Sequence, residues 1–337
     1  MLKIVQDEQI IRRCQRQFVK SFRPFADDKI PVSLGHPGAS VKARVLWSGR
    51  LGIWFLSRKT EEGRYWNAFG TVQPKRDATI PITCEINFPV RGVDRRMGGA
   101  LARDLAGRIF VVHRGKLGGS RKGVGKSLFA DHYRGVWEMM EEGDAETPVA
   151  VIGALQSPRL VRQVTQFIRK VDRIKVMASA RSPQMEMPFH QIEFRETLVG
   201  ERYCDIEKDK GAECDHGLVV GDLSESLRRQ GFKVGNDDFH DLFITNARKE
   251  ITAVFQVRTF GSPASVYSGA TRLLLNSLRL PQPLRLVLVL PEKADPAVEE
   301  KLKKLRIDTI TYEWKGDQAW FPGLKPLLGA LPQADSA

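Results

Sequence analysis

The pattern of apolar residues changes character along the 337-residue chain, and this change limits the folds open to it. From Val41 the apolar residues come in short runs with strand character, several of them separated by glycine-containing turns. From Gly217 such runs alternate with stretches of helical period. At about 150 residues a domain, the length fits two domains. The sequence therefore predicts a β-rich N-terminal domain, a small barrel or sandwich, followed by a mixed α/β domain.

The same pattern sets the expected boundaries. Near the start, Ile11, Cys14 and Phe18 recur at helical spacing. A second amphipathic helix opens at Ser157–Pro158, where serine suits the N-cap and proline the first turn. After Gly217 the expected order is helix, three strands, helix, strand, helix, strand. The predicted segments are a helical lead over 1–30, a basic β-rich domain over 31–177, a linker over 178–216, an α/β domain over 217–315 and a loose tail over 316–337.

Neither a membrane span nor a secretion signal is expected. No apolar stretch approaches the ~18–20 residues that cross a bilayer, and the first residues lack the apolar core of a signal peptide. We therefore expect a cytoplasmic protein without a membrane partner. The 4 cysteines are scattered along the chain, which favours reduced thiols over a disulfide framework.

The charge balance points to a polyanionic partner. The chain has 53 Lys and Arg against 40 Asp and Glu, a formal net charge of +13. Eleven of the basic residues and three aspartates lie between Arg91 and Arg134, a local excess of eight positive charges. Because a solvated surface would spread its charge, this concentration predicts a nucleic-acid-binding region, with DNA as the first candidate partner.

Within this region, residues 115–128 (GKLGGSRKGVGKSL) form a glycine-rich basic loop. Its GKS end is similar to that of a nucleotide-binding P-loop, but position 120 is serine where that motif needs glycine, so nucleotide hydrolysis is the weaker interpretation. We expect a flexible loop whose backbone amides and cations contact phosphates; a merely solvated loop is the alternative. The candidate phosphate contacts are Arg95, Arg96, Arg114, Lys116, Arg121, Lys122 and Lys126.

Tyr65 and Trp66 are candidates for stacking on bases. They lie among arginines and lysines, and aromatic rings next to cations are typical of nucleic-acid readers. Adjacent residues point to opposite faces of a strand, so we expect one of the two rings to be exposed or in a cleft. The alternative is that such rings fill the core of a β-barrel.

Polar residues also gather at the open end of a predicted hairpin. Asp241 starts one predicted strand, and Gln256 and Arg258 lie at the end of the next. A turn centred between residues 248 and 249 is equally far from 241 and 256, so these two residues are predicted to face each other, while Gln256 and Arg258 share one face. Glu225, on the preceding predicted helix, is the candidate second carboxylate.

Two such acids beside a cation can hold magnesium, activate a water and stabilise a pentavalent phosphate. The alternative is an ordinary polar cluster at a sheet edge.

The order GDLSESLRRQGF, DLFIT, AVFQVRT, SVYSGATRLLL, RLVLVLP over residues 217–313 resembles the PD-(D/E)XK nuclease-like fold. Members of that fold carry Asp at the start of one strand and E-x-K near the end of the next. Asp241 matches the aspartate, and Gln256 stands at the glutamate position, which is similar to the Q-x-K form of Mrr-type restriction enzymes. Arg258 stands at the lysine position, and Ala270–Thr271 replaces the usual Gly-Gln pair.

The resemblance implies a DNA-binding protein with a restriction-endonuclease-like domain, acting in genome defence. A second copy of the chain, in a homodimer, is the candidate protein partner. It implies metal-dependent phosphodiester hydrolysis, with Asp241, Gln256, Arg258 and Glu225 as catalytic residues and Asp241 and Glu225 holding Mg²⁺. The departures weaken this chemistry, because glutamine offers a neutral oxygen and arginine does not relay protons at neutral pH. The alternative is a non-catalytic nucleic-acid-binding protein that uses a degenerate nuclease fold as a scaffold.

Overall fold

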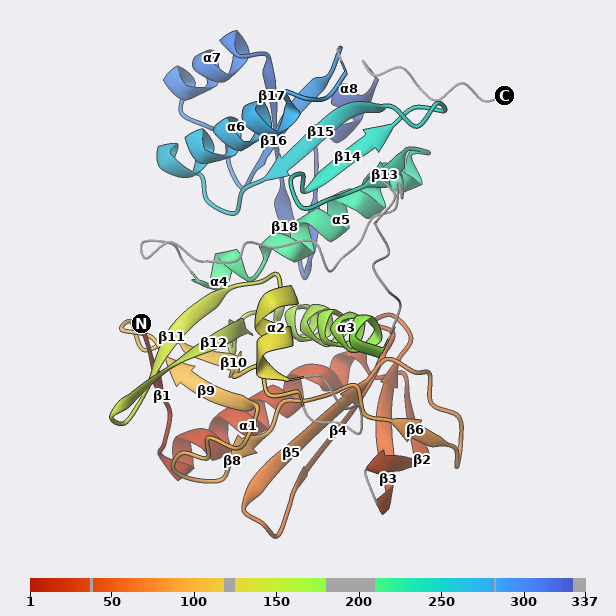
Figure 1. Ribbon diagram of the computed structural model, residues 1–337, viewed down its shortest axis with the longest axis vertical. Helices are drawn as coiled ribbons and strands as arrows, with labels where there is room; N and C mark the ends of the chain where they lie inside the picture. The colour runs from red at the N-terminus through yellow and green to blue at the C-terminus, as the bar shows by residue number, and fades with distance from the viewer. Residues whose placement is uncertain (37–38, 118–124, 180–209, 282, 330–337) are drawn as a thin grey trace. The chain divides into compact units, whose positions relative to one another are not determined.

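The computed structural model describes residues 1–36, 39–117, 125–179, 210–281 and 283–329. The chain divides into two compact units (Figure 1). Of the described residues, those up to 179 belong to unit 1 and those from 210 on belong to unit 2. Unit 1 is built mainly from β-strands, and unit 2 is a mixed sheet with helices. This confirms the predicted mixture of a β-rich N-terminal part and an α/β C-terminal part. None of the helices in the described ranges is long and apolar enough to cross a bilayer.

Unit 1 contains a closed five-stranded barrel in the order β1-β11-β12-β10-β9. Its strands are β1 (Leu2–Ile4), β9 (Gly99–Arg103), β10 (Ile109–His113), β11 (Trp137–Glu142) and β12 (Ala145–Ala154). The barrel closes because β1 pairs with β11 on one side and β9 on the other. Residues 1–30 are therefore not a separate lead, as the sequence suggested, but supply a barrel strand.

The rest of unit 1 is a seven-stranded sheet in the order β6-β2-β3-β4-β5-β7, with β8 also paired to β5. Its strands are β2 (Asp28–His36), β3 (Ala39–Ser48), β4 (Ile53–Lys59), β5 (Arg64–Gly70), β6 (Thr79–Pro81), β7 (Cys84–Glu85) and β8 (Phe88–Pro89). The helices of unit 1 are α1 (Glu8–Phe22), the 3-10 turn η1 (Arg23–Phe25), α2 (Lys126–His132) and α3 (Leu160–Ser179). Hydrophobic clusters cover both faces of this sheet.

Helix α1 belongs to the core that joins the barrel and the sheet. Asp7 caps it, since its carboxylate accepts a hydrogen bond from the Ile10 amide at 2.8 Å. Its Phe18 is fully buried, and its ring lies edge-on to Phe22 and Phe55 at centroid distances of 5.2 and 6.4 Å. Such aromatic pairs contribute beyond the area they bury. One face of α1 is therefore held firmly against the sheet.

Unit 2 has the order of elements that the sequence predicted. The elements are α5 (His216–Arg229), β13 (Lys233–Gly235), β14 (Leu242–Thr245), β15 (Ile251–Val257), α6 (Pro263–Ser277), β16 (Arg285–Leu290), α7 (Pro296–Lys304) and β17 (Ile307–Thr311). They form one sheet in the order β13-β14-β15-β16-β17, antiparallel from β13 to β15 and parallel from β15 to β17. Helix α5 packs on one face of the sheet and α6 and α7 on the other (Figure 1).

The predicted loose tail is wrong for residues 316–329. The chain there forms β19 (Gln318–Trp320), paired with β18 (Glu313–Lys315), and the helix α8 (Leu324–Leu328). Phe321 and Leu324 are buried in the core on the α5 side of the sheet. Proline and glycine in this segment end short elements, but its apolar residues still cover the sheet. Of the predicted linker, residues 180–209 lie outside the described residues, while α4 (Lys210–Glu213) and the start of α5 are helical.

His113 is buried at the end of β10 and is neutral there. Its Nδ1 accepts a hydrogen bond from the Gly115 amide at 3.0 Å, so the proton is on Nε2, which faces the Glu85 carbonyl oxygen at 3.3 Å. Burial lowers the pKa of His113 to about 4; the bond to the Glu85 carbonyl opposes the shift and Arg114 adds to it.

We predict that this histidine makes unit 1 less stable in acid. Below about pH 6.5 this histidine is protonated in the unfolded chain, whereas in the folded chain it stays neutral down to about pH 4. The free energy of unfolding therefore falls by about 3 kcal/mol between neutral pH and pH 4. In chemical denaturation between about pH 7 and pH 4, His113→Asn should lose this part of the pH slope. His132→Gln, a change at an exposed histidine on α2, should keep the wild-type slope. Equal slopes in wild type and His113→Asn would contradict the prediction.

Candidate functional site

The predicted pairing of Asp241 with Gln256 is present. Leu242 pairs with Phe255, so Asp241, just before β14, lies opposite Gln256 near the end of β15. The Gln256 amide nitrogen donates a hydrogen bond to Asp241 Oδ2, and the Val257 backbone nitrogen donates another at 2.9 Å. The register shifts after Ile244, so the irregularity lies near the turn and leaves the open end of the hairpin in the predicted alignment.

The helix residue that contacts Asp241 is His216, and Glu225 does not join this cluster. His216 Nε2 lies 3.2 Å from Asp241 Oδ2, while Glu225 is exposed and paired with Arg229 one turn along α5. Nine residues separate positions 216 and 225, which is roughly 13 Å along a helix and half a turn around it. Glu225 therefore points away from the face that carries His216. A histidine at the start of a helix that precedes the hairpin was the sequence signal for this contact.

Asp241 is ionised in a nearly buried position, where its side chain is 9% exposed. Burial alone raises the pKa of Asp241, but the charge and hydrogen bond of His216, the Val257 amide and the charge of Arg272 on α6 outweigh it and hold the pKa below its ordinary value. Three donors thus converge on one oxygen, Oδ2. The cluster stabilises the carboxylate from within the protein.

Arg258 leaves the hairpin toward α6. It is 5% exposed, and its Nη2 lies 3.5 Å from the Ser268 hydroxyl. Its side chain also crosses Gly269, where a Cβ would lie only 2.8 Å from the Arg258 Nε. The glycine therefore makes room for the arginine, which is held against the helix. Of the three predicted hairpin residues, Asp241 and Gln256 contact each other, whereas Arg258 contacts α6.

The described residues do not fit a magnesium centre. Mg²⁺ prefers carboxylate and carbonyl oxygens in near-octahedral geometry, and here Asp241 supplies the one carboxylate of the hairpin cluster while Gln256 turns its NH₂ group toward it. Within the described ranges no group of three or more His, Cys, Asp or Glu side chains is placed to hold a metal ion. The predicted pair of metal-binding carboxylates, Asp241 and Glu225, is therefore not assembled.

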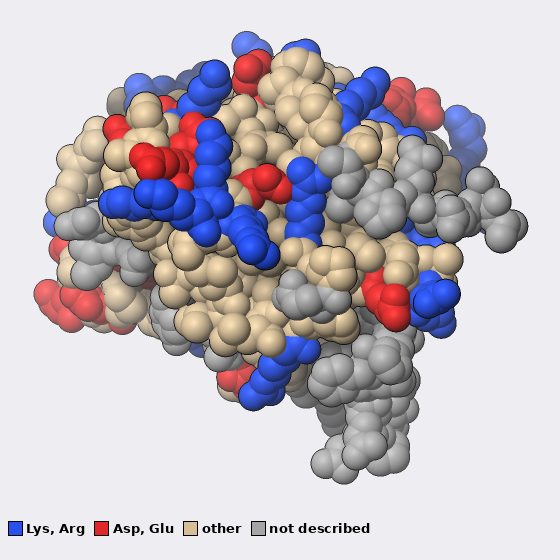
Figure 2. All heavy atoms as spheres, turned by 90° about the horizontal axis from the view of Figure 1, so that it is seen from above, with Lys and Arg blue, Asp and Glu red and all other residues tan. Residues whose placement is uncertain are grey.

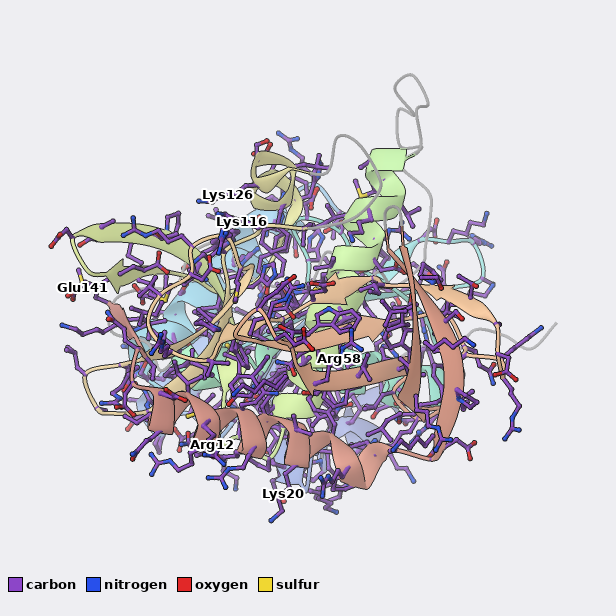
Figure 3. The ribbon with its side chains drawn as sticks, turned by 90° about the horizontal axis from the view of Figure 1, so that it is seen from below. Arg12, Lys20, Arg58, Lys116, Lys126 and Glu141 are labelled. Atoms are coloured by element: carbon purple, nitrogen blue, oxygen red, sulfur yellow. The ribbon has the colours of Figure 1, made fainter. Side chains whose placement is uncertain are left out.

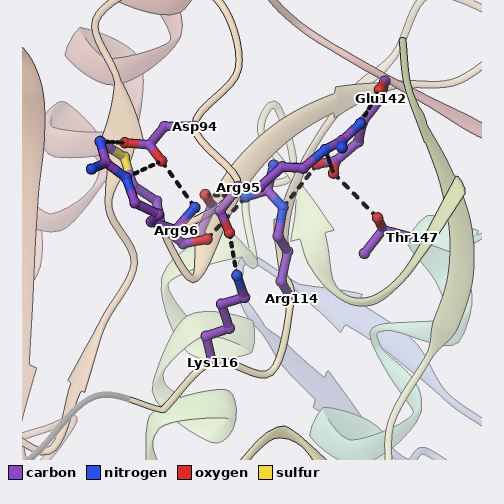
Figure 4. A network of polar contacts seen from close by, with 9 residues as sticks. Asp94, Arg95, Arg96, Arg114, Lys116, Glu142 and Thr147 are labelled. Atoms are coloured by element: carbon purple, nitrogen blue, oxygen red, sulfur yellow. Dashed lines mark hydrogen bonds and ion pairs between the residues drawn. The ribbon is translucent and has the colours of Figure 1, made fainter. Parts of the chain in front are cut away.

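Four cations of residues 91–134, namely Arg95, Arg96, Arg108 and Arg114, form ion pairs with acids of unit 1, and three of them are drawn in Figure 4. Arg114 is 2% exposed and bonds through Nε to Glu142 Oε1 at 2.8 Å, with Glu142 fully buried. Its Nη1 donates to the carbonyl oxygens of Met97 and Gly99 at 3.1 and 3.0 Å. The donors of Arg114 are thus bonded inside the barrel, an arrangement that does not favour the predicted contact with phosphate.

The neighbouring cations are exposed but several are paired. Arg95 donates from Nη2 to the Glu142 carbonyl oxygen at 2.8 Å, and Arg96 bonds Asp94 through Nη2 at 3.0 Å (Figure 4). The ammonium group of Lys116 contacts the Arg95 carbonyl oxygen, and Lys126 is exposed at the start of α2. Arg121 and Lys122 lie outside the described residues. Several of the described cations in this region are therefore held by acids or carbonyl groups of unit 1.

Tyr65 and Trp66 point to opposite faces of β5, and Trp66 is buried while Tyr65 is partly exposed. Trp66 is 5% exposed within the cluster on one face of the sheet, with Arg58 lying 4.5 Å over its ring. Tyr65 packs against the core on the other face. Trp66 therefore belongs to the core, and Tyr65 is the partly exposed ring of the pair.

We predict that Arg114 contributes to stability. Arg114→Met leaves the buried Glu142 carboxylate without its closest cation and with only Arg95, 3.5 Å away and partly exposed, as an ionic partner, so the free energy of unfolding should fall by about 3–5 kcal/mol. Arg114→Met combined with Glu142→Leu should recover part of this loss, since no buried charge remains. Arg96→Met, at an exposed pair, is the matched control and should leave the unfolding midpoint nearly unchanged. Equal midpoints for Arg114→Met and wild type would show that the pair is not stabilising.

Comparisons with known proteins do not add to this description. No family model, curated protein or solved structure matches the chain. The resemblance to the PD-(D/E)XK nuclease-like fold rests on the residues and elements described above.

Proposed function

We propose that this protein binds nucleic acid, with duplex DNA as the first candidate, and that its C-terminal unit is a restriction-endonuclease-like domain that holds DNA without cutting it. The observation that carries the second part is the closed cluster around Asp241. His216, Gln256 and the Val257 amide all bond its Oδ2, in the place where the family binds a metal. A carboxylate satisfied in this way serves structure better than metal-assisted hydrolysis.

The topology of unit 2 supports membership of the nuclease-like superfamily. Its helix, three antiparallel strands, helix and parallel strand follow the order expected for that fold. Asp241 and Gln256, the residues that resemble two motif positions of that fold, lie opposite each other at the open end of the β14–β15 hairpin, which supports the proposal. The net charge of +13 supports a polyanionic partner.

We predict salt-dependent DNA binding without cleavage. Fluorescence anisotropy with a labelled duplex should show affinity that falls steeply with salt, because each neutralised phosphate adds about −0.9 to the log–log slope. Supercoiled plasmid incubated with Mg²⁺ or Mn²⁺ should stay intact, and Asp241→Asn should bind the duplex as wild type does. No duplex binding at any salt concentration would overturn the proposal. Metal-dependent nicking that Asp241→Asn abolishes would overturn its non-catalytic part.

Metal-dependent DNA cleavage is a second candidate, favoured by one observation. Asp241 Oδ1 accepts no hydrogen bond from any described residue, so one carboxylate oxygen is left for another ligand. If cleavage is the function, Gln256→Glu combined with Arg258→Lys should raise the nicking rate, because the change restores a carboxylate and an ammonium group. An intact plasmid with this double variant and with wild type would rule the candidate out.

A further inference from the structure

The exposed face of α1 carries a stripe of cations. They are Arg12, Arg13, Arg16, Lys20 and, in η1 directly after the helix, Arg23. At about 100° of rotation per residue these five positions fall within an arc of about 100°. The buried residues of α1, which include Phe18 and Phe22, lie on the opposite side. The helix thus presents one basic face to solvent because its other face is fixed in the core.

The stripe is not neutralised within the described part of the chain. None of the five side chains makes an ion pair with a described residue, whereas Arg96, Arg108 and Arg114 of the 91–134 region each pair with an acid. Glu8 is the one acidic residue of α1 and lies in its first turn. Arg50 adds an exposed cation at the other end of the stripe, with its guanidinium carbon 5.4 Å from the centre of the Phe25 ring.

The length and direction of the stripe suit a phosphate backbone. From Arg12 to Arg23 it extends about 16 Å, at 1.5 Å per residue. Duplex DNA carries about one negative charge per 1.7 Å of its axis, so several phosphates lie within that length. Figure 3 shows Arg12 and Lys20 on the outer side of α1, pointing away from the strands. Arginine, the commoner residue here, binds phosphate with two parallel hydrogen bonds.

We propose that the basic face of α1, formed by Arg12, Arg13, Arg16, Lys20 and Arg23, contacts the phosphate backbone of duplex nucleic acid. This inference rests on the proposed function and assigns its phosphate contacts to α1 in place of residues 91–134. An anionic membrane is the less suitable partner, because a helix that binds in a bilayer interface buries an apolar face there. The apolar face of α1 is already buried against Phe55 and Phe69.

The lysines of α7 provide a matched control. Lys303 and Lys304 pair with Glu299 and Glu300 at 3.0 and 2.8 Å, and Lys301 contacts the Tyr267 hydroxyl at 3.3 Å. Figure 2 likewise shows a face on which basic and acidic side chains lie next to each other. Replacing these three lysines with glutamine removes as much charge from a helix surface as three changes on α1. Glutamine keeps a helix propensity similar to that of lysine and arginine.

The test compares two triple variants in duplex binding over a series of salt concentrations. Arg12→Gln/Arg16→Gln/Lys20→Gln should flatten the log–log slope by about three and weaken binding at about 0.1 M salt on the order of 100-fold. Lys301→Gln/Lys303→Gln/Lys304→Gln should leave the log–log slope at its wild-type value and should change the affinity by no more than about twofold. Circular dichroism and thermal unfolding of both variants should match wild type, since all the changed residues are exposed.

The outcomes separate this inference from the proposed function. If wild type binds the duplex and the α1 variant binds as tightly, or if both variants lose affinity equally, the stripe is not the phosphate contact and the proposed function stands. If wild type binds no duplex at any salt concentration, both are wrong. Binding of wild type, but not of the α1 variant, to vesicles of anionic lipid without duplex binding would assign the stripe to membranes and overturn the inference.

Discussion

The packing of Phe18 and Phe22 against the sheet of unit 1 fixes the orientation of α1. This orientation determines which side chains of the helix are exposed to solvent. The Phe22 ring stacks on Phe55 at 4.6 Å and lies 5.5 Å from Phe69, and Phe18 contacts Phe88 as well. Removing one such ring from a core costs about 3–5 kcal/mol. Because the helix cannot rotate without losing these contacts, its arginines and its lysine are held toward solvent.

The charge of unit 1 divides into two kinds with different roles. Arg114 and Glu142 are buried, 28 residues apart in sequence, and each is satisfied by further hydrogen bonds inside the barrel. A buried charge needs such partners because leaving water is costly. The cations of α1 are exposed to water and therefore need no partner inside the protein. Since no described acid pairs with them, these surface cations can bind an anionic partner.

The mixed sheet of unit 2 carries a hydrogen-bonded polar cluster at the open end of its hairpin. The contact between Asp241 and Gln256 follows from the hairpin register, and His216 completes it from α5. In a low-dielectric site the three donors on Oδ2 stabilise the negative charge of the Asp241 carboxylate. The hairpin register that brings Asp241 and Gln256 together therefore also accounts for the ionised carboxylate.

The sequence by itself determined the order of the elements from α5 to β17 and the register of the hairpin formed by β14 and β15. The alternation of helical and strand periods predicted α5 to β17 in order, because these periods are properties of neighbouring residues. The pairing of Asp241 with Gln256 was predictable because a hairpin of known centre allows one alignment. Only the tertiary structure decided that Arg114 is buried, that Trp66 is covered, that Glu225 faces away from Asp241 and that residues 316–329 are packed. Each of these features depends on contacts between residues far apart in the sequence. The local periodicity of apolar residues carries no information about such contacts.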